Sequence, residues 1–354
     1  MQNWQWRLAV LVVTAGWLVQ SVAANAAAPT VPNPAAAHFS RASRTKVAAY
    51  VGYYVARLRK AKNPHQMFRA RENLLLPLRE KGNPPSAIFS NLYGTRIAAQ
   101  LTPLLSDKRL ALAAIITIAK VNDLSTQRAL KRGLQNPSAA VRYWAGRGLA
   151  SLLPELEQIP QAFRQSVRWI KDALAKETDP IVMEEFCDTL AGLNPPSTGA
   201  APLMVRSLEK IVAAYGQVPP ENLEVAAGIA SDLNQTLAGG GLRTAQQKTA
   251  ALGVLADLMS YAAQYWNAGL LNRTQKLVVA NAIAVCGQAM NAISGSQAFT
   301  IKGIRSRPSD PARILSQVND LTGSQEHKGR LQKLFPKIAI PPRIPGDSTP
   351  PATR

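Results

Sequence analysis

Apolar residues recur every three to four positions along most of the chain, and this spacing constrains the fold more than any other feature of the sequence. The first such stripe, between residues 46 and 62, consists of Val47, Tyr50, Val51, Tyr54, Val55 and Leu58. This spacing places apolar side chains on one face of an α-helix. No stretch of any length alternates apolar and polar residues between turn residues, as a half-buried strand does. The sequence therefore predicts an all-α fold.

Three dipeptides mark expected helix starts. Asn63-Pro64, Asn136-Pro137 and Asp179-Pro180 each precede an apolar-periodic run. Asn or Asp caps the first free N–H groups of a helix, and proline suits the first helical position because it has no N–H to leave unsatisfied. The last two pairs lie about 40 residues apart, which is typical of a repeating helix pair.

Residues 136–150 (NPSAAVRYWAGRGLA) resemble the second half of a HEAT repeat. The residues at the family's signature positions are Pro137, Val141, Arg142, Ala145 and Leu149, while Asn136 replaces the usual Asp and Gly148 the usual Ala. Residues 179–193 and 107–119 resemble degenerate copies of the same pattern. The resemblance implies an α-α superhelix, or solenoid, of stacked helix pairs. In that family the turn Asp of one repeat meets the Arg of its neighbour, which would pair Asp179 with Arg142.

The expected solenoid fills residues 41–335. An apolar share of 47% is enough for a substantial core. Beyond residue 193 the expected helix pairs lack the signature and cover residues 202–215 with 221–237, 244–266 with 274–293, and 311–321 with 325–334. Neighbouring pairs would bury each other's apolar faces, giving about ten to thirteen helices in one continuous stack.

Both ends of the chain differ in composition from this repeating part. Residues 27–40 form a Pro- and Ala-rich linker without periodicity, which contains His38. Residues 336–354 contain six prolines, a spacing that forbids a helix and favours solvated, extended backbone. The sequence therefore predicts disordered tails at both ends of the solenoid, over residues 27–40 and 336–354.

The first 26 residues have the organisation of a cleavable signal peptide. Arg7 precedes an apolar run over residues 8–19, and residues 24–26 form an A-x-A cleavage site. An uncleaved anchor is the alternative, but polar residues at 20, 21 and 25 keep the apolar run below the roughly 20 residues of a membrane helix. No cysteine near the site offers a lipid attachment point. We expect a periplasmic or extracellular protein without a transmembrane span after cleavage.

Basic residues outnumber acidic ones by 41 to 21, which gives a formal charge of +20. Six bases fall on matching faces of two expected neighbouring helices, and two more lie on the first helix: Arg128, Lys131, Arg132, Arg164, Arg168, Lys171, Arg57 and Lys60. Helices stacked roughly 8 to 10 Å apart would join the first six into one band. We expect these bases to contact an anionic partner, which is an acidic protein, a polysaccharide or a membrane surface.

The charge has two other interpretations: solubility of an exported protein, which remains open, and nucleic acid binding, which is disfavoured. High net charge also keeps an exported protein soluble, with each cationic head in water above an apolar stem. Nucleic acid is the usual partner of a basic solenoid. Export removes that partner, and the stretch lacks the interleaved aromatic residues that bind single strands. We therefore do not expect nucleic acid binding.

The sequence offers little material for catalysis. Its histidines number three, and no His-x-x-x-His, Glu-x-x-His or Cys-x-x-Cys spacing occurs. We predict no catalytic residues, no metal and no cofactor, and expect a non-enzymatic binding or scaffold protein. One alternative is an enzyme of unrecognised type on a HEAT-like scaffold, lyase-like, with His65 or His327 as base. The other is a purely structural envelope component.

Apolar helical stripes also account for most of the cysteine and aromatic residues. Cys187 and Cys286 lie on such stripes and are expected to be buried, with a bridge between them disfavoured by their separation in a repeat stack. The aromatic set expected in the core is Trp144, Trp169, Phe186, Tyr261, Tyr265 and Trp266. Tyr143 points off its stripe, so it is the candidate for an exposed aromatic ring.

Overall fold

The computed structural model describes residues 28–79, 84–197, 199–215, 222–237, 241–269, 271–301, 304 and 310–342. The predicted signal peptide lies outside these residues. Within them the chain forms 14 α-helices and three short 3-10 turns, with no strand. The all-α prediction is confirmed.

The first half of the described chain contains eight helices, which are α1 (Arg41–Lys60), α2 (Pro64–Leu75), α3 (Ala87–Leu101), α4 (Ala111–Val121), α5 (Gln127–Gly133), α6 (Ala139–Leu156), α7 (Pro160–Lys176) and α8 (Pro180–Ala191). The second half contains α9 (Ala200–Ala213), α10 (Leu223–Leu237), α11 (Ala245–Asn267), α12 (Arg273–Ser294), α13 (Pro311–Thr322) and α14 (Arg330–Leu334). The 3-10 turns are η1 (Leu76–Leu78), η2 (Thr102–Ser106) and η3 (Leu124–Thr126).

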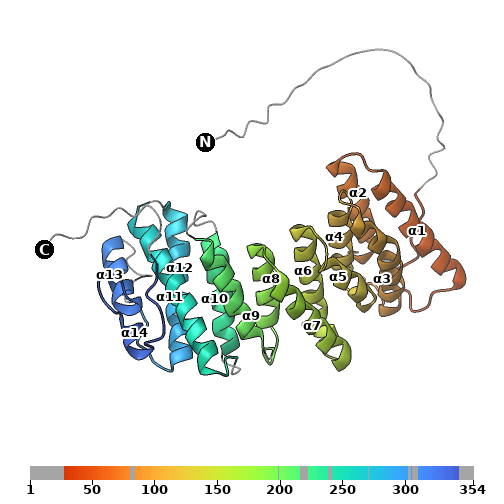
Figure 1. Cartoon of the computed structure of the whole chain (residues 1–354). Helices are drawn as coiled ribbons and strands as arrows, with labels where there is room; N and C mark the ends of the chain where they lie inside the picture. Colours follow the sequence, from red (N-terminus) through yellow and green to blue (C-terminus); the bar gives the residue numbers. More distant parts are fainter. Residues whose placement is uncertain are drawn as a thin grey trace, which may run out of the picture.

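The helices are arranged in two rows that follow chain order from one end of the molecule to the other (Figure 1). In one row α2, α4, α6, α8, α10 and α12 each pack against the next. In the other row α7, α9, α11 and α13 pack successively, and α3 contacts the η3 turn that leads into α5. Successive helices in the chain join the two rows into pairs.

One continuous hydrophobic core runs between the rows, from Phe39 before α1 to Ile338 after α14. Each pair contributes apolar residues to both of its neighbours, because a lone helix pair cannot cover its own apolar face. By length and composition alone, helix α12 could cross a membrane. It packs here against α10 and α11, and 56% of its most apolar 18-residue stretch is buried inside the protein.

Two of the three predicted capping pairs open helices as expected. Asn63 Oδ1 accepts a hydrogen bond from the Gln66 N–H at 2.9 Å, and Pro64 is the first residue of α2. Asp179 accepts from two N–H groups of α8, which begins at Pro180. The third pair lies one turn before its helix, since α6 begins at Ala139 and Asn136 Oδ1 accepts from the Ser138 N–H.

The flanking segments are more ordered than the sequence suggests. Phe39 is buried with its ring centroid 5.6 Å from that of Phe89, and the Ser86 N–H donates to the Pro34 carbonyl at 2.9 Å. At the other end Ile338 is buried, and the Gln264 side chain donates to the Pro342 carbonyl at 3.1 Å. The prediction of disordered tails is wrong around Phe39 and for residues 336–342, because Phe39 packs on Phe89 and Ile338 is buried beside Gly253 of α11. The remainder of the C-terminal tail lies outside the described residues.

Glycines allow the close approach of α6 to its neighbours. A Cβ atom on Gly148 would lie 2.6 Å from Leu130 Cδ2 and 3.0 Å from the Ala119 Cα in α4. A Cβ atom on Gly146 would overlap the Phe186 ring in α8. The departure from the HEAT pattern at position 148 therefore has a packing reason.

We predict that Gly148→Ala destabilises the protein by about 1–3 kcal/mol, since the backbone of α4 would have to move. The matched control is Gly52→Ala, because a Cβ at that position in α1 meets only the Gln100 side chain at 3.8 Å. This control should be neutral or stabilise by about 0.5–1 kcal/mol. Urea unfolding measures both, and equal effects of the two substitutions would contradict the close packing of α4 on α6.

Candidate functional site

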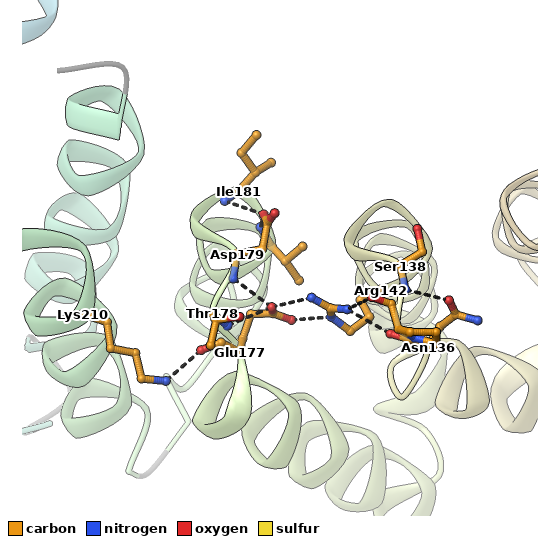
Figure 2. Close-up of polar contacts among 10 residues, drawn as sticks. Asn136, Ser138, Arg142, Glu177, Thr178, Asp179, Ile181 and Lys210 are labelled. Carbon is orange, nitrogen blue, oxygen red and sulfur yellow. Dashed lines mark hydrogen bonds and ion pairs between the residues drawn. The ribbon is translucent and has the colours of Figure 1, made fainter. Parts of the chain in front are cut away.

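An ion pair joins Arg142, in the first turn of α6, to the buried Glu177 in the turn before α8 (Figure 2). Arg142 donates from Nε and Nη2 to the two carboxylate oxygens of Glu177, each at 2.7 Å. Its Nη1 donates to the carbonyls of Asn136 and Pro137, both at 2.9 Å. Only 3% of the Glu177 side chain is exposed. Four of the five guanidinium N–H groups are thus used to hold two turns together.

The acid that meets Arg142 is Glu177, so the predicted Asp179–Arg142 pair is wrong. Asp179 is engaged as the N-cap of α8, whereas Glu177 also accepts the N–H groups of Thr178 and Asp179 at 2.9 and 3.0 Å. Burial by itself would raise the pKa of Glu177, but the Arg142 hydrogen bonds and these N–H groups outweigh it and lower that pKa. The same pairing raises the pKa of Arg142.

Comparable bonds join other turns to their neighbours. The Arg109 guanidinium donates to the carbonyls of Arg59 and Ala61, and the Asn136 amide donates to the Leu105 carbonyl at 2.7 Å. Lys210 on α9 donates to the Glu177 carbonyl at 2.7 Å (Figure 2). We call these contacts, together with the Arg142–Glu177 pair, the turn ladder. It fixes the spacing between successive helix pairs from α1 to α9.

A cleft of about 1040 Å³ opens beside the turn ladder, between the end of α5 and α7. Helix α5 has seven residues and α7 has seventeen, so α5 covers only part of the α7 face. Gln127 ties the start of α5 to α7 by a 2.8 Å hydrogen bond to Ser166. Arg142 and Glu177 lie at the wall formed by the ladder. A second wall is formed by residues of α7 at helical spacing, namely Gln161, Arg164, Gln165, Arg168, Trp169, Asp172, Ala173 and Lys176.

Five basic side chains line this cleft and exceed its two acids by three charges. Glu177 is neutralised by Arg142, and Arg168 lies 3.8 Å from Asp172 in an exposed pair that contributes little. Within the described part of the chain, Arg164 and Lys176 form no ion pair. The cleft is therefore electropositive and has cations available to a ligand.

The predicted site residues lie in five different places. Lys131, Arg164 and Arg168 line the cleft together. Arg132 donates to Ser106 Oγ at 3.2 Å, and Lys171 lies on another side of α7 beside Gly199. Arg128 is exposed on α5 outside the cleft. Arg57 and Lys60 lie on α1, where Arg57 stacks on Tyr53. Of the six bases expected to form one band, three line this cleft and the other three lie outside it.

Several cleft residues were absent from the sequence-based site. Lys176 and the amides of Gln135, Gln161 and Gln165 line it, as does Trp169. Trp169 was expected in the core, yet it is partly buried, with Lys131 Nζ 4.7 Å from its ring centroid. The signal that could have found them is the polar stripe at i, i+3 and i+4 along residues 161–176, which continues the spacing of Arg164 and Arg168.

The other aromatic and cysteine predictions are mostly confirmed. Phe186, Tyr261, Tyr265 and Trp266 are buried. Trp144 is only partly buried, with Lys120 and Arg147 each 5.9 Å from its ring. Tyr143 is partly buried as well, and its hydroxyl accepts from Arg147 at 2.8 Å. Cys187 and Cys286 are buried free thiols.

The histidines lie apart from the cleft. His65 is exposed near the start of α2, and His327 lies at the surface with its ring 3.7 Å from Asp320 and 3.0 Å from Ser324 Oγ. Among the described residues no group of three His, Cys, Asp or Glu side chains has the geometry of a metal site.

A smaller acidic groove of about 370 Å³ lies between α8 and α10. Burial, and then neighbouring carboxylates that include Asp188, raise the pKa of Glu184 and of Asp232 to about 7. Gly228 leaves room for the Glu184 carboxylate against α10. Arg147 reaches Glu185, at 3.9 Å, from the α6 side of the groove. The groove therefore crowds carboxyl groups that resist ionising together, and Glu184 and Asp232 titrate near neutral pH.

No family model matches the chain, and no curated protein matches it.

We predict a large coupling energy between Arg142 and Glu177. Arg142→Met should cost roughly 3–5 kcal/mol, because it leaves the buried Glu177 carboxylate uncompensated. Adding Glu177→Gln should recover more than about 1 kcal/mol, whereas adding Asp179→Asn should recover less than about 0.5 kcal/mol. Urea unfolding of the two double-mutant cycles gives both values. A larger coupling to Asp179 would contradict the turn ladder.

We predict that the acidic groove makes the protein more stable as the pH falls from 8 to 5. A carboxyl group with a pKa of about 7 in the folded protein binds its proton more tightly there than in the unfolded chain. Its ionised form therefore destabilises the fold fully above pH 7. This destabilisation disappears as the pH falls toward the pKa of the unfolded chain. Glu184→Gln with Asp232→Asn should raise the free energy of unfolding at pH 8 by about 1 kcal/mol after solvent screening. The same two substitutions should change the free energy of unfolding little at pH 5. The control is Glu155→Gln, at an exposed position. An equal effect at both pH values would count against the groove.

Proposed function

We propose that this protein is an exported, non-enzymatic binding or scaffold module that holds an anionic partner in the cleft between α5 and α7. The observation that carries the proposal is the convergence of Lys131, Arg164 and Arg168 with Lys176 on one concave surface. A concave site with excess positive charge attracts anions from solution and holds them where part of the water is displaced.

We further propose that the fold is a HEAT-like α-solenoid. The two rows of helices support this, since each helix packs on the equivalent helix of the next pair. The HEAT-like motif at residues 136–150 contributes Arg142 to the turn ladder, although its partner is Glu177. In such an architecture each pair contacts only its neighbours, so the surface is long and suits an extended partner.

Export to the periplasm or extracellular space belongs to the same proposal and rests on the sequence of residues 1–26. In that compartment an acidic protein, an anionic polysaccharide or a membrane surface is the available polyanion. Sequencing the N-terminus of the protein purified from its native host tests this part directly. A mature chain starting at Ala27 supports it, and an intact Met1 in a cytoplasmic fraction contradicts it.

The binding proposal predicts salt-dependent retention on a sulfated polysaccharide resin. Replacing Lys131, Arg164 and Arg168 with alanine should lower the eluting salt concentration. It should also reduce the slope of log affinity against log salt by about two to three, because fewer counterions are released on binding. Retention is measured by a salt gradient on heparin-like resin.

The matched control removes three exposed bases outside the cleft, namely Arg206, Arg243 and Lys248. It lowers the net charge by the same amount. If charge position matters, this variant elutes close to the wild type. Equal losses in the two triple variants would show that net charge alone causes retention and would overturn the cleft as the binding site.

A further inference from the structure

The cleft between α5 and α7 combines three kinds of chemistry on neighbouring side chains. It has cations without an acidic partner, carboxamides, and the partly buried indole of Trp169. A site selected only for negative charge needs cations alone. The additional groups therefore narrow the class of ligand that fits.

The carboxamides of Gln135, Gln161 and Gln165 are exposed in the cleft, and none of them bonds to another group in the described part of the chain. Each amide offers two donor hydrogens and one acceptor oxygen. A carboxylate or sulfate only accepts, so it leaves the amide oxygens unsatisfied. Hydroxyl groups donate and accept, so a polyhydroxylated ligand satisfies all three amides.

Trp169 provides a flat apolar surface in the same cleft. The Lys131 ammonium lies over its ring, 4.7 Å from the centroid, where the ring quadrupole attracts it. An anionic group entering the cleft would pair with Lys131 and draw it off the ring. The ring face would then become available to an apolar face of the ligand, such as the C–H face of a sugar ring.

Arg164 and Lys176 both line the cleft from α7, just over three turns apart, and provide anion contacts at two places along it. A guanidinium can bind a carboxylate or sulfate through two parallel hydrogen bonds. The volume of about 1040 Å³ is at the upper end for sites that hold drug-sized ligands, so several linked rings fit.

We propose that the cleft binds an acidic oligosaccharide, with a sugar ring stacked on Trp169 and its carboxylate or sulfate groups on Lys131, Arg164 and Lys176. This inference rests on the proposed function and specifies its ligand class. An acidic peptide is the competing ligand: its backbone amides can also pair with the three carboxamides, but its carboxylate side chains offer no flat apolar ring face to the indole of Trp169.

The test is a titration of the chain without residues 1–26, with binding measured by calorimetry at low and at high salt. Four probes are used: a heparin hexasaccharide, a uronic acid oligosaccharide, a neutral oligosaccharide of equal length, and an oligoglutamate peptide. We expect one or both acidic saccharides to bind at least about tenfold more tightly than the other two probes. Trp169→Leu, which retains apolar packing, should weaken the preferred saccharide about tenfold and leave the peptide unchanged.

Trp144→Leu is the matched control, because Trp144 is also partly buried beneath Lys120 and Arg147 but lies outside the cleft. It should leave saccharide affinity unchanged. In this variant Trp169 emission should also shift when the preferred saccharide binds and stay constant with oligoglutamate. That readout keeps the test valid if Trp169→Leu fails to fold.

The two proposals fail differently. Three results would overturn the saccharide inference. The first is equal affinity for oligoglutamate and the acidic saccharides, and the second is equal affinity for the neutral and the acidic saccharides. The third is a saccharide affinity that Trp169→Leu leaves unchanged. Salt-dependent binding of anions would still stand in the first and third cases. Absence of any salt-dependent anion binding to the wild type would overturn both proposals.

Discussion

Burial of the apolar face between successive helix pairs is the constraint on which the rest of the structure depends. A pair of amphipathic helices exposes apolar surface on both sides, and only a neighbouring pair covers it. The continuous core from Phe39 to Ile338 is the result. Close spacing requires small residues where helices cross, which explains Gly146 and Gly148 in α6. Segments that flank the helices add to the same core, since Phe39 packs on Phe89 of α3 and Ile338 is buried beside Gly253 of α11.

Apolar burial alone leaves the relative position of the pairs loosely specified, and the turn ladder adds directional contacts. Arg142 joins two turns through Glu177 and two carbonyls, and Lys210 extends the connection to α9. A buried ion pair is a poor source of net stability, but breaking it is costly. The ladder therefore contributes to the registration of neighbouring pairs. It also forms a wall of the cleft, so the same contacts that set the spacing shape the candidate site.

The sequence predicted most helices because apolar periodicity and capping are local. Asn63 and Asp179 act as predicted, whereas Asn136 lies a turn earlier because Ser138 precedes α6. The ladder partner was missed, since Asp179 and Glu177 are two residues apart and only the three-dimensional turn shows which one faces Arg142. Lys131, Arg164 and Arg168 were identified and line the cleft, whereas Lys171 does not line it and Trp169, expected in the core, is only partly buried. Helix α5 is too short to cover the Trp169 indole fully. Helical periodicity shows which face of α7 is apolar, but it does not show where the neighbouring helix ends.

Hydrogen–deuterium exchange with and without an acidic oligosaccharide tests the central claim most directly, because it locates the ligand without altering any residue. The account predicts slower exchange at low salt in α7 and in residues 131–136, with little change in α1 and α11. The effect should disappear at high salt, where the cleft's charges are screened. Protection concentrated on α1, or spread evenly over all basic segments, would contradict the cleft as the binding site.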